Sequence, residues 1–492
     1  MSQGTNRRDF IKYTAATGMG YWVAARKTAA DDALGSKSPN ERLNVACVGI
    51  GGKGDSDSEQ VSKHANVVAV CDVDDKRLDK KINQEIKGKD GSASRPFENA
   101  KRYNDFRKLF DDMDKSIDAV TVSIPDHMHA VVTMMAIKAG KHVYTQKPMT
   151  HDVYEARQLR LAVVEHKVAT QMGNQGTASP KLREGVEMIQ AGTIGPVTEV
   201  HIWTNRPIWP QAPKIMTRPE GQPVPEYLHW PEWLGTAPER PYSDAYHPFK
   251  WRGFWDFGTG ALGDMGCHTA NLPFMALKLG HPTSLLGAAG DLNTETYPSW
   301  AHVQYEFAAR ENMPPVKVNW YEGKKDGVLV HPPEELVTKV LAEFAKIPHG
   351  DKEKKKKNAE GKKKELLLNN SGSIVVGEKG IMYSPHDYGG EWYLLPAEEF
   401  KDYKAPPETL PRNGAGGDED QKIEWLAAAK GGPPAMANFN YAGMLTEFIL
   451  LGNVAIKNSG KMLYWDGPNM KFPNAPEAEA SLRREYSKGY SL

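Results

Sequence analysis

The stretch that decides the fold is Leu43-Asn44-Val45-Ala46-Cys47-Val48-Gly49-Ile50-Gly51-Gly52-Lys53-Gly54. Its first half is a short apolar run with β-branched residues, which predicts a buried strand. Its second half matches G-x-G-x-x-G, in which the glycines allow a tight turn, a close backbone approach to a pyrophosphate, and close packing of the next helix. The predicted cofactor loop comprises Gly49, Gly51, Gly52 and Gly54. The motif alone is a weak signal, so a dinucleotide site needs support from the next segments of the chain.

A second apolar run, 67–71, ends in Asp72, about 20 residues after the first glycine, where such folds carry an acidic residue. That acidic residue binds the ribose hydroxyls of a dinucleotide and repels a 2′-phosphate. We therefore expect NAD as the cofactor. NADP is the less favoured alternative, which Lys76 and Arg77 keep open.

Two further strands are expected at 119–124 and 141–145. Because the carboxyl ends of parallel strands line the ligand crevice of such sheets, residues at these ends are candidate cofactor contacts. Beyond Asp72, these candidates are Ser123, Pro125, His129 and Gln146. For His129 the alternative is a structural residue packed beneath the cofactor. The pattern predicts a doubly wound parallel Rossmann domain over residues 41–170.

Charge and hydropathy exclude several classes of protein. The 62 Lys and Arg residues balance 62 Asp and Glu residues, so no net charge attracts nucleic acid. The mean hydropathy of −0.57 and the lack of a long uninterrupted apolar run argue against membrane insertion. Three scattered cysteines fit neither a metal cluster nor a disulfide framework, and we expect no metal.

Residues 1–40 are expected to form a leader and linker. The segment Asn6–Lys12 places Arg7 and Arg8 before an aromatic residue and a lysine, and a mildly apolar stretch comes next. This resembles a twin-arginine export signal and predicts a periplasmic location. The alternative is a basic leader without export function, which would leave the protein in the cytoplasm. Twin-arginine export carries folded proteins, so we expect the cofactor to be tightly bound.

The rest of the chain, 171–492, is expected to form a substrate-binding α+β domain. Within it, a glycine-rich approach at 257–263 leads into a helical pattern through Leu279. That pattern places Asp264 and His268 one turn apart on one face, where two titratable groups can share one substrate. The alternative is a structural Asp–His pair at a helix start.

Lys147 stands before Pro148, which holds it in an extended conformation at the carboxyl end of a strand. It is a candidate catalytic residue, and the alternative is an exposed lysine without a role. Between about 350 and 366 the chain is rich in lysine and poor in apolar residues, which indicates a solvated insertion.

Asn174 and Gln175 are candidate substrate contacts, because amides offer a donor and an acceptor to sugar hydroxyls. A loop-rich segment beyond them carries half of the tryptophans, and its rings suit the apolar faces of sugars, although packing in the core is the alternative for each. From it we select Trp251. The six tryptophans are Trp203, Trp209, Trp230, Trp233, Trp251 and Trp255.

On these residues the chain resembles the Gfo/Idh/MocA family of oxidoreductases. The family's Glu-Lys-Pro signature falls on Gln146-Lys147-Pro148, and its Asp-x-x-x-His signature matches Asp264 to His268. The resemblance implies a Rossmann domain followed by an α+β domain with a large open, mostly antiparallel sheet. It also implies a catalytic role for Lys147, whereas Gln146 departs from the family's glutamate. We further expect a homo-oligomer formed through the second sheet.

The expected function is oxidation of a sugar or polyol secondary alcohol by hydride transfer to bound NAD. His268 or Lys147 takes the hydroxyl proton, and Asp264 orients His268 and binds an adjacent hydroxyl. An exported enzyme has to regenerate its cofactor in place, so a second sugar as hydride acceptor stays open. A redox-neutral cycle that cleaves a glycoside through a transient ketone also stays open. A third alternative is a non-catalytic sugar-binding protein with a structural dinucleotide, which Gln146 would suit.

Overall fold

The computed structural model describes residues 41–88, 91–347, 367–487 and 489–492. Two features expected from the sequence lie outside these residues. They are the leader at 1–40 and the lysine-rich insertion at about 350–366.

Six parallel strands form the first sheet, in the order β5-β2-β1-β6-β7-β8. Its central strands are rich in Val, Ala and Cys and are buried on both faces, as expected of a parallel sheet covered by helices. The strands are β1 (Asn44–Val48), β2 (Asn66–Cys71), β5 (Lys101–Tyr103), β6 (Ala119–Val122), β7 (His142–Thr145) and β8 (Thr170–Met172). The helices between them are α3 (Lys53–Ser62), α4 (Asp75–Ile82), α5 (Phe106–Met113), α6 (Asp126–Lys138) and α7 (Val153–His166). A short hairpin, β3 (Ile86–Lys87) and β4 (Ala93–Ser94), stands apart.

The second sheet has nine strands in the order β16-β15-β14-β9-β12-β11-β10-β17, with β13 paired to β12. Among the described strands of this sheet, β9 and β12 run parallel, and the other pairs are antiparallel. Its strands are β9 (Val197–Thr204), β10 (Ser284–Gly290), β11 (Trp300–Phe307), β12 (Val316–Lys325), β13 (Val328–Leu329), β14 (Ser371–Gly377), β15 (Ile381–Ser384), β16 (Tyr393–Leu395) and β17 (Met462–Tyr464). The expected pairing of a Rossmann sheet with a large, mostly antiparallel sheet is confirmed.

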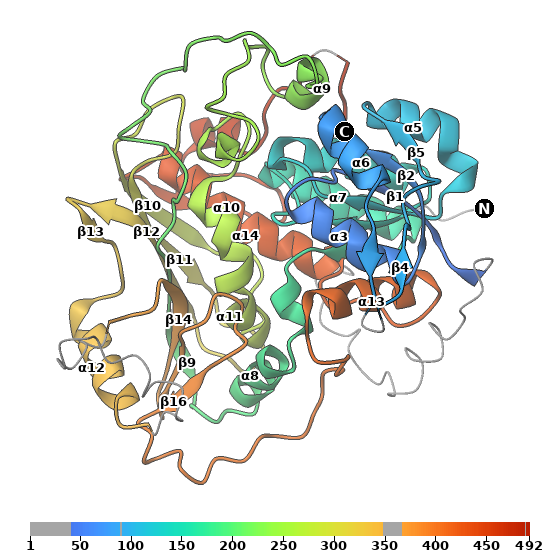
Figure 1. Ribbon diagram of the computed structural model, residues 1–492. Helices are drawn as coiled ribbons and strands as arrows, with labels where there is room; N and C mark the ends of the chain where they lie inside the picture. The colour runs from blue at the N-terminus through green and yellow to red at the C-terminus, as the bar shows by residue number, and fades with distance from the viewer. Residues whose placement is uncertain (1–40, 89–90, 348–366, 488) are drawn as a thin grey trace, which may run out of the picture.

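Helices fill the space between the two sheets (Figure 1). The helices of this layer are α8 (Pro180–Gln190), α10 (Gly260–Thr269), α11 (Asn271–Ala276) and α14 (Phe439–Lys457). α14 packs on α7 of the first domain and on β10 of the second, so it joins the two cores. With 19 residues it is long and apolar enough to cross a membrane, although the sequence pattern did not predict such a run. Of the apolar stretch of this helix, 83% is buried inside the protein, so packing in the core accounts for its apolar composition.

α13 (Asp418–Ala429) comes late in the chain but packs on the first sheet. Its Trp425 and Leu426 join the core around Val45 and Tyr144, and Tyr144 donates a hydrogen bond to Gln421 at 2.8 Å. Figure 1 shows this orange helix beside the blue α3. A segment from the range assigned to the second domain thus covers part of the first.

Two expected helices differ from the structure. The helical pattern through Leu279 is two helices, α10 and α11, because Pro273 has no N–H and is tolerated only in the first turn of a new helix. The charged residues of 477–485 also favour a helix in the sequence, but the structure has a short 3₁₀ turn at Pro476–Ser481, after which Arg484 contacts other elements. The remaining helices are α9 (Trp230–Leu234) and α12 (Glu334–Phe344).

Candidate functional site

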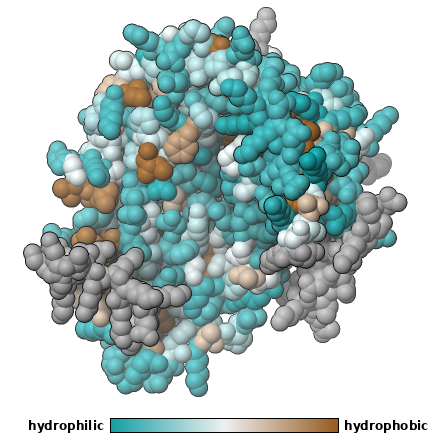
Figure 2. All heavy atoms as spheres, viewed as in Figure 1, coloured by the Kyte–Doolittle hydropathy of each residue, from teal (hydrophilic) through white to brown (hydrophobic). Residues whose placement is uncertain are grey.

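A cavity of about 480 Å³ lies at the carboxyl ends of the first sheet and reaches α10, where Asp264 and His268 line it. This is within the size range of small-molecule sites, and it lies where open parallel sheets bind their ligands. Figure 2 shows a mostly hydrophilic face, with apolar side chains in small separate groups. The residues that line the cavity therefore indicate its ligand better than the surface around it does.

The glycine loop forms one end of this cavity, lined by Gly49, Gly51 and Gly52. Gly49 has a φ of 81°, and a Cβ there would lie 2.2 Å from the Ser123 carbonyl oxygen. A Cβ on Gly54 would lie 2.2 Å from the Gly49 carbonyl oxygen, so Gly54 keeps α3 close to the loop without lining the cavity. Backbone N–H groups at the start of α3 are the groups that hold a pyrophosphate. The loop therefore fits a dinucleotide.

Asp72 lines the cavity at the end of β2. Its carboxylate accepts hydrogen bonds from the backbone N–H of Ile50 at 3.0 Å and of Asp74 at 3.1 Å. Burial raises the pKa of Asp72, against the opposing charge of Arg77. Arg77 also lines the cavity, beside Gly51.

Two segments close over this end of the cavity. The 227–229 segment pairs with the chain after β2: His229 donates its backbone N–H to the Val73 carbonyl at 2.9 Å. Near the C-terminus, Arg484 bonds the Asp152 carboxylate at 3.1 Å and Tyr486 donates to Glu155 at 2.6 Å. Tyr490 then lines the cavity. These two segments would cover the adenosine end of a bound dinucleotide.

Three lining residues meet one buried carboxylate, that of Asp57 on α3. Asp57 accepts hydrogen bonds from Gln146 Nε2 at 2.7 Å and from Ser123 Oγ at 2.9 Å. It also forms an ion pair with Lys53 at 2.5 Å. Lys422 of α13 adds a second ion pair at 2.8 Å, and both its side chain and that of Asp57 are fully buried. Asp57 thus fixes the orientation of the amide that stands where the family has a glutamate.

His129 does not line the cavity. Its Nδ1 lies 2.7 Å from the Pro148 carbonyl oxygen and its Nε2 lies 2.7 Å from that of Ile124. The ring therefore ties together the two loops that leave β6 and β7. Of the two interpretations of His129, the structure supports the structural one, and Pro125 is the lining residue here.

Lys147 and Asp264 meet across the domain boundary, although 117 residues separate them. Lys147 Nζ lies 2.8 Å from Asp264 Oδ1 and 2.7 Å from the Asp264 carbonyl oxygen. Arg206 and Arg252 also reach this carboxylate, each through Nε at 3.3 Å. Burial alone would raise the pKa of Asp264, but these three cations hold it well below its usual range.

Arg252 has a carboxylate partner of its own. Its Nη1 lies 2.9 Å from both oxygens of Asp126, which is fully buried at the start of α6. Thr259 donates its backbone N–H and its hydroxyl to the same carboxylate. This arrangement fixes the entry to α10 and, with it, the position of Asp264.

His268 lines the same cavity one turn after Asp264. Burial, followed by the charge of Lys147, lowers the pKa of His268 well below its ordinary value, so the ring is neutral at neutral pH. Its Nδ1 has no hydrogen-bond partner among the described residues, and its ring meets Tyr388 edge-on with centroids 4.6 Å apart. The expected orientation of His268 by Asp264 is therefore wrong: the Asp264 carboxylate is held by cations instead.

The three expected substrate contacts have different positions. Gln175 and Trp251 line the cavity, and the Arg252 guanidinium lies 4.4 Å from the centre of a Trp251 ring. Asn174 is fully buried and does not line it; its Nδ2 approaches the Cys267 carbonyl oxygen at 3.5 Å. The expectation for Asn174 is corrected, because the chain turns inward against α10 at this point.

Sequence reasoning missed Arg206, Arg252, Asp57, Lys422 and Tyr388. Arg252 could have been selected because it follows Trp251. Lys53, which was also not selected, could have been found in the same way because it lies in the glycine loop. For Arg206, Asp57 and Lys422 no local pattern exists, because their partners come from distant segments.

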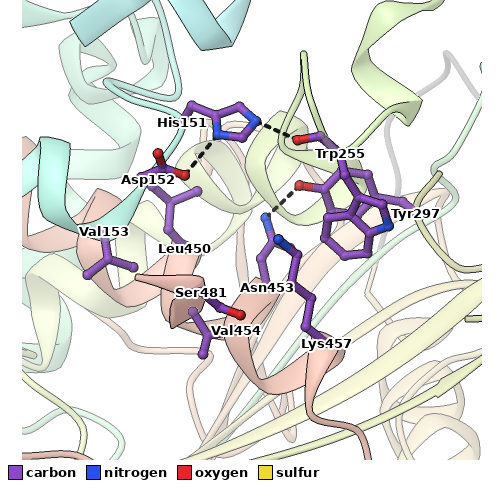
Figure 3. Close-up of a pocket in the computed structure, with 10 residues that line it drawn as sticks. All are labelled: His151, Asp152, Val153, Trp255, Tyr297, Leu450, Asn453, Val454, Lys457 and Ser481. Carbon is purple, nitrogen blue, oxygen red and sulfur yellow. Dashed lines mark hydrogen bonds and ion pairs between the residues drawn. The ribbon is translucent and has the colours of Figure 1, made fainter. Parts of the chain in front are cut away.

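A second, much smaller cavity of about 20 Å³ has room for about one water. Figure 3 shows His151 between the Asp152 carboxylate and the Trp255 carbonyl oxygen, each at 2.9 Å. Burial would raise the pKa of Asp152, but His151 and Arg484 lower it to about 2. We assign these residues to the junction between the domains.

Comparison with known proteins agrees with this geometry. Residues 43–174 match the family model of the Gfo/Idh/MocA oxidoreductases described as an NAD-binding Rossmann fold, and residues 188–312 match the model of their C-terminal α/β domain. The chain belongs to the Gfo/Idh/MocA family. Its first domain is accordingly an NAD-binding domain, as the glycine loop and Asp72 predict.

Curated relatives match over part of their length. A glycosyl hydrolase family 109 protein of Solibacter usitatus is 30% identical over 161 residues, 32% of this chain and 35% of the relative. A levoglucosan dehydrogenase of Pseudarthrobacter phenanthrenivorans is 24% identical over 181 residues, 37% of each chain. The chain thus spans about a third of the length of these relatives.

Solved structures match over most of the chain. The WlbA dehydrogenase of Bordetella pertussis, in complex with NADH and UDP-GlcNAcA, has a TM-score of 0.52 and 14% identity, over 86% of this chain and 99% of that one. The aldose-aldose oxidoreductase of Caulobacter crescentus, complexed with glycerol, has a TM-score of 0.51 and 14% identity, over 86% and 100%. At these identities the likeness shows the fold.

Proposed function

We propose that this protein oxidises a secondary alcohol of a sugar or polyol, with NAD held in the cavity as the hydride acceptor. The observation that carries the proposal is the 2.8 Å contact of Lys147 with Asp264 beside His268, in a cavity continuous with the glycine loop. A family signature from each domain meets at one place. Two relatives are named as dehydrogenases of levoglucosan and of scyllo-inositol, which is consistent with this substrate class.

Each residue of the site has its own role in this reaction. Lys147 donates a hydrogen bond to the reacting oxygen and stabilises the negative charge that develops as its proton leaves. His268, neutral and next to the charge of Lys147, accepts the hydroxyl proton. The alcohol carbon loses its hydrogen with the electron pair to NAD, which supplies the acceptor, and a ketone remains. Lys147 as the proton acceptor is the other assignment, and the pH dependence of the rate separates the two.

We propose further that NAD is bound tightly and in preference to NADP. The support is Asp72 at the ribose position and the chain that covers it, including Tyr490. The purified protein should release NAD or NADH when denatured. Dominant release of NADP would overturn the assignment of Asp72 and would point to Arg77 as the deciding residue.

The test of the activity uses the purified holoenzyme and a panel of sugars, polyols and glycosides. Nicotinamide absorbance measures hydride transfer to the bound cofactor, and mass spectrometry identifies the ketone. Absence of reduction by every member, with NAD present at full occupancy, would favour the non-catalytic sugar-binding protein. Reduction that stops after one turnover and resumes on adding a second sugar would identify hydride exchange between sugars.

A redox-neutral glycoside cleavage is the second candidate, favoured by the family 109 relative. In that cycle the transient ketone acidifies the neighbouring C–H, the glycosidic group leaves, water adds, and the hydride returns. The same panel decides between the two reactions. Release of the aglycone without net reduction of NAD would establish the cleavage.

We propose a homo-oligomer that associates through the open face of the second sheet. Gln304 and Glu306 alternate on this face with buried residues of β11. Light scattering during size exclusion measures the assembly, and a monomer at micromolar concentration would contradict it.

A further inference from the structure

The substrate end of the cavity holds more positive than negative charge. Three cations, Lys147, Arg206 and Arg252, converge on Asp264. The described residues supply one further carboxylate at this place, that of Asp126, which Arg252 contacts twice at 2.9 Å. Three cations against two carboxylates leave one positive charge in excess.

The other titratable groups nearby form no ion pair with these three cations. Asp387 acts on the adjacent Tyr388, but among the described residues its carboxylate pairs with none of Lys147, Arg206 and Arg252. Burial and Lys147 keep His268 neutral, and burial raises the pKa of Tyr388, so its hydroxyl is also neutral. Near the glycine loop, the positive charges of Lys53 and Lys422 are balanced by two other carboxylates. The two carboxylates that balance the lysines are Asp57 and Asp418.

The excess resides on Arg206. Asp264 makes its shortest contact, 2.8 Å, with Lys147 and reaches Arg206 only at 3.3 Å. Among the described residues, the Arg206 side chain has one other partner, the Asn205 side-chain oxygen, 2.7 Å from Nη1. Its side chain is 23% exposed and lines the cavity, so further N–H groups of the guanidinium remain for a ligand.

We infer that the substrate is a sugar acid whose carboxylate binds Arg206, while its alcohol group lies between Lys147 and His268. This inference rests on the proposed function and names its substrate class. A planar carboxylate matches the fork of a guanidinium, and its single charge matches the single excess charge. A phosphate ester would bring nearly two negative charges to the same place. Asp264 separates the acid subsite from the reacting oxygen.

The experiment compares matched pairs of probes on the NAD-loaded protein: D-glucuronate with D-glucose, and D-galacturonate with D-galactose. Isothermal titration calorimetry measures binding without requiring turnover, and nicotinamide absorbance measures hydride transfer. We expect each acid to bind at least about tenfold more tightly than its neutral partner. Arg206→Gln should remove about 10- to 100-fold of the acid's affinity, as expected for one charge-assisted pair, and should lower the ratio of acid to neutral affinity by the same factor, because a loss through the Arg206–Asp264 pair affects both sugars alike. Arg218→Gln is the matched control, since Arg218 belongs to the same loop segment, pairs with Glu295 and does not line the cavity.

The outcomes separate this inference from the proposed function. Acid and neutral sugar binding equally, or Arg206→Gln weakening both alike, would overturn the acid subsite whether or not NAD is reduced. Tighter binding of glucose 6-phosphate than of glucuronate would also overturn it. Preferential, Arg206-dependent binding of the acids supports the subsite even if hydride transfer fails, and that failure would count against the proposed activity alone.

Discussion

Asp264 shows how the function of one side chain is set by its neighbours. Three cations hold the pKa of its carboxylate well below the usual range, so Asp264 is a poor proton acceptor in the working pH range. The proton of the substrate alcohol must therefore go to another group, and the two that line the cavity beside it are His268 and Lys147.

Replacing His268 with alanine should lower turnover by roughly 100-fold or more, the scale of a positioned acid–base group. NAD retention should not change, because the glycine loop holds the cofactor from the other end of the cavity. Rates are measured with saturating substrate, and His302→Ala on β11, outside the cavity, is the control. Near-normal turnover would remove His268 from the mechanism.

The pH profile then distinguishes the two bases. Because burial and Lys147 lower the pKa of His268 below its ordinary 6.5, a rate that depends on neutral His268 persists below pH 6.5 and falls only at still lower pH. An acidic limb well above pH 6.5 would instead assign the proton to Lys147.

Gln146 and Asp57 allow a charge-exchange test. A glutamate at position 146 would put a second carboxylate within hydrogen-bond distance of Asp57, since Gln146 Nε2 lies 2.7 Å from it. We expect Gln146→Glu to weaken NAD retention by about 10-fold or more, because two adjacent carboxylates cannot both ionise. Lower pH, which protonates one of them, should restore binding.

The double variant Gln146→Glu, Asp57→Asn returns the site to one carboxylate and one amide. It should recover most of the lost retention, measured as NAD remaining after gel filtration. A double variant that is worse than both single variants would show that Asp57 acts through Lys422 and Lys53 rather than through Gln146.

At this scale the sequence predicted the residues that belong to contiguous motifs. Lys147, Asp264 and the glycine loop lie where expected, because each is identified from its immediate neighbours. Arg206, Asp57 and Lys422 were not predictable, because an ion pair between segments far apart in the chain leaves no periodic or local mark. The prediction for Asn174 was wrong for a related reason, because the sequence does not distinguish an amide that faces a ligand from one that faces a carbonyl group.

Among the elements, β12 carries a buried acid that titrates near neutrality. Glu322 is 1% exposed, and burial raises its pKa to about 7 against the opposing hydrogen bond from Trp320 Nε1 at 2.7 Å. In the unfolded chain its pKa is about 4.5. The folded state therefore holds the proton more strongly, and stability falls as pH rises from about 4.5 to about 7.

Glu322→Gln should remove this loss. The variant should be more stable than the parent above pH 7, by up to about 3 kcal/mol, and the gain should vanish near pH 4.5. Thermal unfolding monitored by circular dichroism at both pH values measures it. Glu226→Gln, at an exposed loop position outside both sheets, is the control, and an equal gain in both variants would contradict the assignment.

Element boundaries were predictable where propensity and packing agree. The β-branched and aromatic residues of β9 favour a strand, and the sheet buries most of them. The prediction of one long helix through Leu279 was wrong, because the missing N–H of Pro273 outweighs a continuous apolar pattern. The apolar character of α14 was missed because two domains bury it from opposite sides.

For the whole molecule, we propose that the segment Asn6–Lys12 acts as a twin-arginine export signal. Changing Arg7 and Arg8 to lysine should hold the precursor in the cytoplasm of a bacterial host that has twin-arginine export. Cell fractionation with an antibody to the mature protein measures it. Undiminished periplasmic protein in this double variant would eliminate the export proposal, and Arg26→Lys, the same change outside the motif, is the matched control.

The position of α13 has a consequence for how the protein is made. Tyr144 on β7 of the first sheet bonds Gln421, 277 residues later in the chain, and Asp57 beside the glycine loop pairs with Lys422. A ribosome has to synthesise nearly the whole chain before the nucleotide-binding domain receives its last covering helix. Until then the nascent domain lacks the Lys422 partner of Asp57 and the helix that covers Tyr144. We therefore expect the NAD-binding domain to reach its final packing only after α13 has been synthesised.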